Sequence, residues 1–146
     1  MVNETVLHRI LYVGTGLVIV VTLILAFIVI PSVRMDTSPQ ADPERAVPGI
    51  LFVIIIHLII VVALVRTILV NQRGGRIGKG LLIGMGVLLL FLSLMVLDGA
   101  SAYLSHPDPI MHKVPVSMFI CTGCNFIASL LTFLVAWYSK RLQSLS

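Results

Sequence analysis

Five side chains with chemical capacity fall inside long apolar stretches of this sequence: His57, Asp98, Cys121, Cys124 and Asn125. A helix rises about 1.5 Å per residue, so His57 lies about 12 Å from the start of its stretch and Asp98 about 9 Å from the end of its own. Ionisable groups inside a membrane usually face the protein interior and are paired. We therefore expect His57, Asp98 and Asn125 to form one polar intramembrane layer, with His57 as the partner of Asp98.

Such a layer can serve two purposes. It can bind or move a proton, an ion or a small ligand. Alternatively, Asp98 is neutral or is capped by Ser93, Ser101 or Asn125, and the polar groups only hold the helices together. A third interpretation is that the span is shorter than predicted and Asp98 reaches the surface. The residue types do not choose among these interpretations.

Metal and pigment ligands are a second group of candidates. His106, Asp108 and His112 crowd the stretch 105–115, and together with Asp98 they could hold zinc or copper. His57 could ligate haem or chlorophyll, although no second histidine lies at a matching depth. We predict no bound cofactor and leave haem, chlorophyll, quinone and a metal ion open. No catalytic triad, paired-carboxylate or HExxH pattern occurs, so an enzyme is the less favoured class.

The elements that must position these residues are four apolar runs at about 10–30, 50–70, 81–104 and 116–138. Each has the roughly 20 residues that a helix needs to cross about 30 Å of hydrocarbon. The composition agrees, since 58% of the chain is hydrophobic and 11% is charged. The sequence predicts an all-α integral membrane protein, a four-helix bundle made of two hairpins in a single domain, residues 1–146. Between the first two runs, 32–47 reads as an exposed turn with one short helix after Asp42-Pro43-Glu44.

The fourth run contains Cys121-Thr122-Gly123-Cys124, which has the CxxC spacing of thiol redox sites. With this motif in the last of four spans, the chain resembles the membrane thiol oxidoreductases of the vitamin K epoxide reductase type. The resemblance implies a redox role for Cys121 and Cys124 with a quinone. That family carries a second cysteine pair in its first outer loop, and this chain has only 2 cysteines. The other interpretation is that both cysteines are small packing residues.

The basic residues set the expected orientation. If the N-terminus is cytoplasmic, seven of the 10 Lys and Arg residues lie inside and three lie outside, which satisfies the positive-inside rule. The inner set is Arg9, Arg66, Arg73, Arg76, Lys79, Lys140 and Arg141, and the outer set is Arg34, Arg45 and Lys113. We expect both termini in the cytoplasm. The net charge of +4 is explained by topology, so no nucleic-acid partner is expected.

Small residues predict where the helices pack. Gly80 and Gly84 form a small-xxx-small pair, so Gly84→Leu is expected to disrupt the third span. On the fourth span, small and polar residues recur every three or four positions on one face: Ser117, Cys121, Asn125, Ala128, Thr132 and Ala136. We expect this face to be a contact seam.

Three functions remain open. The leading one is a non-catalytic accessory or oligomer-forming subunit of a membrane assembly, because nearly all of the chain lies in spans. The second is a small transporter or proton/ion permeation protein that uses His57, Asp98 and Asn125. The third is a thiol oxidoreductase that uses Cys121 and Cys124. The expected partners are the lipid bilayer, other membrane subunits or copies of this chain, and the absence of a eukaryotic targeting signal favours a prokaryotic inner membrane.

Overall fold

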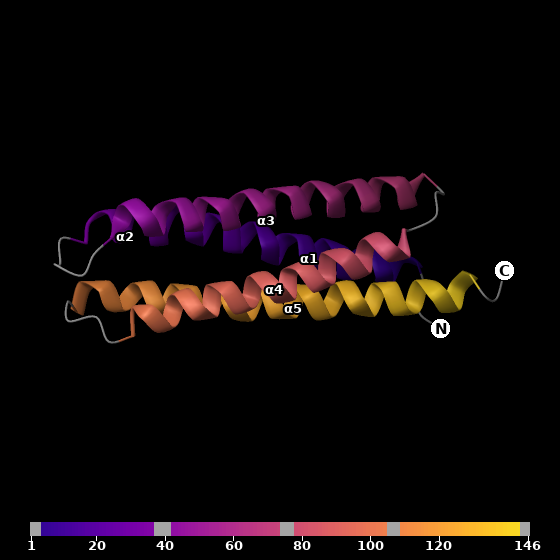
Figure 1. Ribbon diagram of the computed structural model, residues 1–146. Coiled ribbons are helices and arrows are strands. Elements are labelled where there is room, and N and C mark those ends of the chain that lie inside the picture. Colours follow the sequence, from indigo (N-terminus) through magenta and orange to yellow (C-terminus); the bar gives the residue numbers. More distant parts are fainter. Residues whose placement is uncertain (1–3, 37–41, 74–77, 105–108, 144–146) are drawn as a thin grey trace.

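The computed structural model describes residues 4–36, 42–73, 78–104 and 109–143. The described residues are helical almost throughout, and the helices lie side by side along one long axis, with both termini at the same end (Figure 1). In chain order the elements are α1 (Glu4–Ile24), the π-helix η1 (Leu25–Val29), α2 (Ile30–Arg34), α3 (Pro43–Gln72), α4 (Lys79–Ala102), the 3-10 helix η2 (Pro109–His112) and α5 (Lys113–Gln143).

Four helical segments in the described residues are long and apolar enough to cross a membrane: Thr5–Arg34, Pro43–Gln72, Lys79–Ala102 and Lys113–Ser139. The prediction of an all-α protein with four spans is thereby confirmed. The helices are mostly longer than the apolar runs, because polar residues at either end continue the helical backbone. This is a multi-pass membrane protein by the length and composition of its helices.

The first span does not end at its proline, as the predicted boundary at residue 30 implied. Pro31 has no N–H to donate, so a regular α-helix would leave a carbonyl without a partner one turn earlier. The backbone widens just before it, where the Ile30 N–H bonds to the Leu25 carbonyl five residues back. The Ser32 hydroxyl donates to the Ile28 carbonyl at 2.6 Å. These bonds carry the helix on to Arg34.

The short helix expected after Asp42-Pro43-Glu44 is instead the first turn of α3. Asp42 is the N-cap, and its Oδ1 accepts from the Arg45 backbone N–H at 3.1 Å. Pro43 follows at the start of the helix, where a missing N–H costs nothing. The loop between the first two spans is therefore shorter than predicted.

The closest helix packing joins α4 to α5, and α1 packs against both α5 and α3. α3 is the least buried of the four spans. Its start and the end of α4 face one another at the end of the bundle opposite the termini, which we call the far end (Figure 1). The cavity described below lies there.

The glycine prediction for α4 is wrong within this chain. Gly80 and Gly84 are exposed, and a Cβ added at either would meet no atom within 4 Å. The close approach occurs at Gly86, where an added Cβ would lie 2.9 Å from the Phe133 ring of α5. Spacing alone placed the glycines on a helix without showing which side faces α5.

Candidate functional site

The polar face of α5 touches every other span. The Cys121 thiol lies 4.0 Å from the Val21 carbonyl of α1, and the Ser129 hydroxyl donates to the Gly86 carbonyl of α4 at 2.7 Å. The Ser93 hydroxyl of α4 donates in return to the Thr122 carbonyl at 3.0 Å. The expected seam residues are buried except Ser117, which is half-buried: the buried ones are Cys121, Asn125, Ala128, Thr132 and Ala136.

The contact from α5 to α3 is a buried histidine–asparagine pair. His57 and Asn125 are both fully buried, and His57 Nε2 lies 3.0 Å from Asn125 Oδ1. His57 Nδ1 lies 2.7 Å from the Val53 carbonyl, which can only accept, so Nδ1 carries a proton. The Asn125 Nδ2 group has no hydrogen-bond partner among the described residues.

These contacts determine how the pair is protonated. A neutral imidazole with its proton on Nδ1 presents Nε2 as an acceptor, and an acceptor cannot bond to Asn125 Oδ1. Turning the amide over lets Nδ2 donate to Nε2 and gives that group its partner. The alternative, an imidazolium that donates on both sides, would place a net charge in the membrane interior and leave Nδ2 unsatisfied. The neutral pair is the favoured state.

Asp98 does not join His57. Both ring nitrogens of His57 are taken by Val53 and Asn125, whereas the Asp98 side chain is exposed. Of the expected polar layer, the structure brings together His57 and Asn125 and places Asp98 on the cavity at the far end. The expected His57–Asp98 pair is therefore wrong, because equal depth does not place two side chains on facing sides of their helices.

The remaining predicted sites are the cysteine pair, the metal ligands and the haem or chlorophyll ligand. Cys121 is buried, Cys124 is half-buried, and both are free thiols. His106 and Asp108 lie outside the described residues, and His112 is exposed. Among the residues that are described, no three His, Cys, Asp or Glu side chains are grouped closely enough to hold a metal ion. Ligation of haem or chlorophyll through His57 would require breaking its contact with Asn125.

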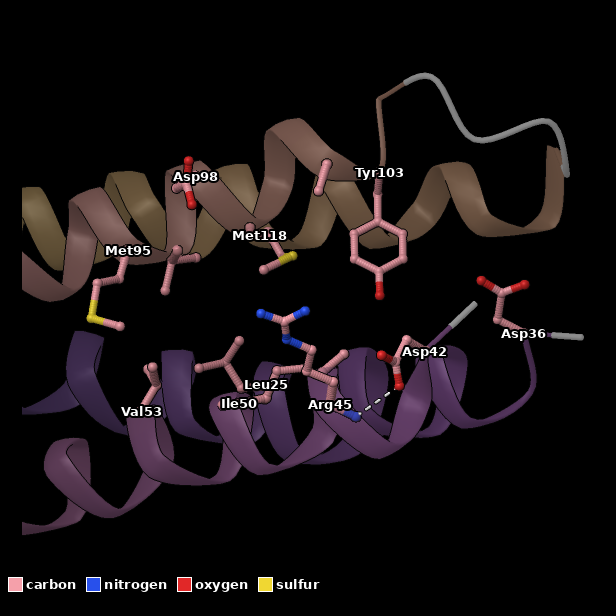
Figure 2. Close-up of a pocket in the computed structure, with 15 residues that line it drawn as sticks. Leu25, Asp36, Asp42, Arg45, Ile50, Val53, Met95, Asp98, Tyr103 and Met118 are labelled. Carbon is pink, nitrogen blue, oxygen red and sulfur yellow. Dashed lines mark hydrogen bonds between the residues drawn. The ribbon is translucent and has the colours of Figure 1, made fainter. Parts of the chain in front are cut away.

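A cavity of about 680 Å³ lies between α3 and α4 at the far end. Figure 2 shows the two helices forming its walls, with Leu25 of η1 and Met118 of α5 also on its lining. Its volume falls within the range of about 300 to 1,000 Å³ that is usual for small-molecule sites. Its lining is mostly apolar, with a few charged and polar groups.

Most of the polar groups on the lining gather at one end of this cavity. Arg45 extends from α3 toward α4, and the Tyr103 ring extends from the end of α4 toward α3, with Asp42 and Asp36 beside them (Figure 2). Burial raises the pKa of the Tyr103 phenol above its usual 10.0, and the negative charge of Asp36 raises it further. Val53 and Met95 lie toward the other end, where Asp98 stands on the α4 wall (Figure 2).

Sequence reasoning missed this cavity. The sequence indicated only that Arg45 is an outer basic residue and that Asp42 precedes a short helix. The one available signal was the concentration of charged residues and a tyrosine at span ends on the same side. Nothing in the spacing showed that α3 and α4 stand apart there.

At the end of the bundle that holds the termini, polar side chains tie α1 to α3. His8 of α1 contacts the Asn71 amide, and the Gln72 amide donates to the Tyr12 hydroxyl at 2.9 Å. These contacts fix one end of the α1–α3 pair, while the cavity occupies the other.

No protein family, curated protein or solved structure matches this chain.

Proposed function

We propose that this protein is a non-catalytic membrane module that acts as an accessory or oligomer-forming subunit of a larger membrane assembly. The observation that supports this best is the use of its polar intramembrane side chains. His57, Asn125 and Ser129 are buried and each joins two helices. Groups engaged in holding helices together are not available to bind a substrate.

The proposal includes the arrangement in the membrane. The chain forms two hairpins with both termini in the cytoplasm, so the far end and its cavity face the outside of a prokaryotic inner membrane. The distribution of Lys and Arg supports this orientation. Lipid and other subunits, or copies of this chain, cover the exposed apolar side chains of the spans.

The test is the mass of the protein taken from its native membrane in a lipid-retaining polymer, measured by native mass spectrometry. We expect a discrete particle heavier than one 15.9 kDa chain, with a fixed stoichiometry that persists on dilution. A particle that contains a single copy of this chain and no other protein at every concentration would contradict the proposal.

Transport is the second candidate, and one contact favours it. Val53 lines the cavity, and its carbonyl accepts a hydrogen bond from His57 Nδ1, so the buried pair lies one helical turn from the cavity wall. If the chain conducts protons, vesicles that contain it will dissipate an imposed pH gradient faster than lipid-only vesicles, and His57→Leu will stop this. Equal rates for the two kinds of vesicle would exclude proton conduction.

A further inference from the structure

The cavity between α3 and α4 changes in character along its length. Away from its outer end it is lined mainly by apolar side chains: Leu25, Ile50, Val53, Met95 and Met118 (Figure 2). Its outer part holds charged groups at the level where the spans end. An occupant that fits both parts must be amphiphilic. A wholly polar solute would make no apolar contacts with the inner walls, and a hydrocarbon would cover the charged groups without pairing them.

The order of the charges narrows the choice. Figure 2 shows the Arg45 guanidinium next to the apolar part, near Met118, and the Asp42 and Asp36 carboxylates farther out. Along this line, from inside to outside, the cavity presents apolar walls, the Arg45 cation and then the Asp42 and Asp36 anions. A third carboxylate, Asp98, also lines the cavity, on the α4 wall and farther in than Arg45 (Figure 2).

We propose that this cavity binds a membrane lipid whose headgroup carries a phosphate followed by a primary amine. The acyl chain lies against the apolar walls, the phosphate meets Arg45, and the ammonium group meets Asp42 and Asp36. Guanidinium groups suit phosphate because they donate two parallel hydrogen bonds.

Three lipids that share the same acyl chains separate the contributions of the headgroup. Phosphatidylethanolamine has the phosphate and an ammonium with N–H donors, phosphatidylcholine has a methylated ammonium without donors, and phosphatidylglycerol has no amine. We expect native mass spectrometry of the purified protein to show one phosphatidylethanolamine held per chain about tenfold more tightly than either of the others. Equal affinity for all three, or tighter binding of phosphatidylglycerol, would overturn the proposal.

Substitutions test the location of the site. Gly49 lines the cavity, and a Cβ added there would meet no atom within 4 Å, so Gly49→Leu extends a side chain from the wall without a clash at its base. Gly84→Leu is the matched control, because Gly84 is equally unobstructed and is not on the lining. We expect Gly49→Leu to abolish binding of phosphatidylethanolamine and Gly84→Leu to preserve it. Equal binding by the two variants would place the lipid elsewhere.

The charged contact has its own control. Arg45→Gln should weaken phosphatidylethanolamine binding about tenfold, because a charge-assisted contact to phosphate is lost. Arg34→Gln removes an exposed cation near the same end that does not line the cavity, and it should leave binding unchanged. Equal losses of binding in both variants would show that the lipid responds to the overall surface charge and not to Arg45.

The lipid site does not depend on the proposed function. A chain isolated without partner subunits would contradict the subunit role and would leave these binding results unaffected.

Discussion

The buried imidazole is satisfied by two neutral partners. His57 is fully buried and donates from Nδ1 to the Val53 carbonyl, and with the Asn125 amide turned over its Nε2 accepts a hydrogen bond from Asn125 Nδ2. Nothing in this arrangement requires the imidazole to be charged. The neutral form of a titratable group is the less costly one within hydrocarbon. The pair thus links α3 to α5 without creating an ion in the membrane.

A double-mutant cycle between His57 and Asn125 should reveal this link. With His57→Leu and Asn125→Leu made singly and together, we expect a coupling free energy of about 0.6 kcal/mol and at most about 1.7 kcal/mol, the range measured for hydrogen bonds between membrane helices. Unfolding in detergent provides the measurement. The corresponding cycle between His57 and Asp98 should give a coupling close to zero, and a larger value there than for Asn125 would reverse the assignment.

Tyr103 offers a titration outside the spans. Its pKa is raised above 10.0 first by burial and then by Asp36, so the folded state favours the neutral phenol. The resulting stability is fully present below the unfolded pKa and is lost as pH rises through the higher folded pKa. In a Tyr12→Phe, Tyr138→Phe background, the phenolate absorbance should have a midpoint above 10.0. Adding Asp36→Asn should lower that midpoint but leave it above 10.0, because Tyr103 remains buried. A midpoint at or below 10.0 with Asp36 present would contradict the assignment.

At the scale of the helical element, the rotation of a helix about its axis decides which residues matter. Gly86 faces the Phe133 ring of α5, whereas a Cβ added at Gly84, two residues earlier, would meet no atom within 4 Å. The same rotation explains why Asn125 and not Asp98 reaches His57. Side chains of α5 therefore approach α4 closely at Gly86 and at Gly99, where an added Cβ would lie 2.7 Å from Met118 Cε, and not at the small-xxx-small pair.

Substitutions at the two glycines should differ in sign. Gly86→Leu forces bulk against Phe133, and overpacking of this kind typically costs about 1 to 3 kcal/mol. Gly84→Leu meets no obstruction and gains helix propensity, so its stability should be unchanged or higher by a few tenths to about 1 kcal/mol. Thermal midpoints in the same detergent measure both. A lower midpoint for Gly84→Leu than for Gly86→Leu would show that α4 packs through the other face.

The spacing of residues along the sequence determines the number of spans and the depth of each side chain, but not which way the side chain faces. Apolar runs fix the number of spans, because about 20 residues are needed to cross the bilayer whatever surrounds them. Residue counts also give depth, which is why His57 and Asn125 could be assigned to one layer. They do not give the angle about the helix axis, and in this bundle the π-helical turn before Pro31 changes the register of the first span as well. The cavity depends on the angle and spacing of α3 and α4, so its residues could not be grouped beforehand.

At the scale of the whole molecule, the two ends of the bundle differ. The end with the termini is closed by contacts between α1 and α3, such as that of Gln72 with Tyr12. The far end holds the cavity and its carboxylates (Figure 1 and Figure 2). If both termini are cytoplasmic, the cavity faces the outer leaflet, and the side of the membrane from which a lipid enters is decided by the topology alone.

Reporter fusions settle that orientation. A reporter joined after Ser146 should be active only in the cytoplasm, and one inserted at Gln40 only outside, because seven of the 10 basic residues lie on the side of the termini. Accessibility of single cysteines to an impermeant thiol reagent, in a variant without Cys121 and Cys124, provides an independent measurement. Introducing Lys residues next to Gln40 should weaken the preference, since the rule responds to local Lys and Arg. If a reporter at Ser146 proves to be external, the orientation is the reverse of the one proposed, and the cavity with Arg45 and its carboxylates lies in the cytoplasmic leaflet.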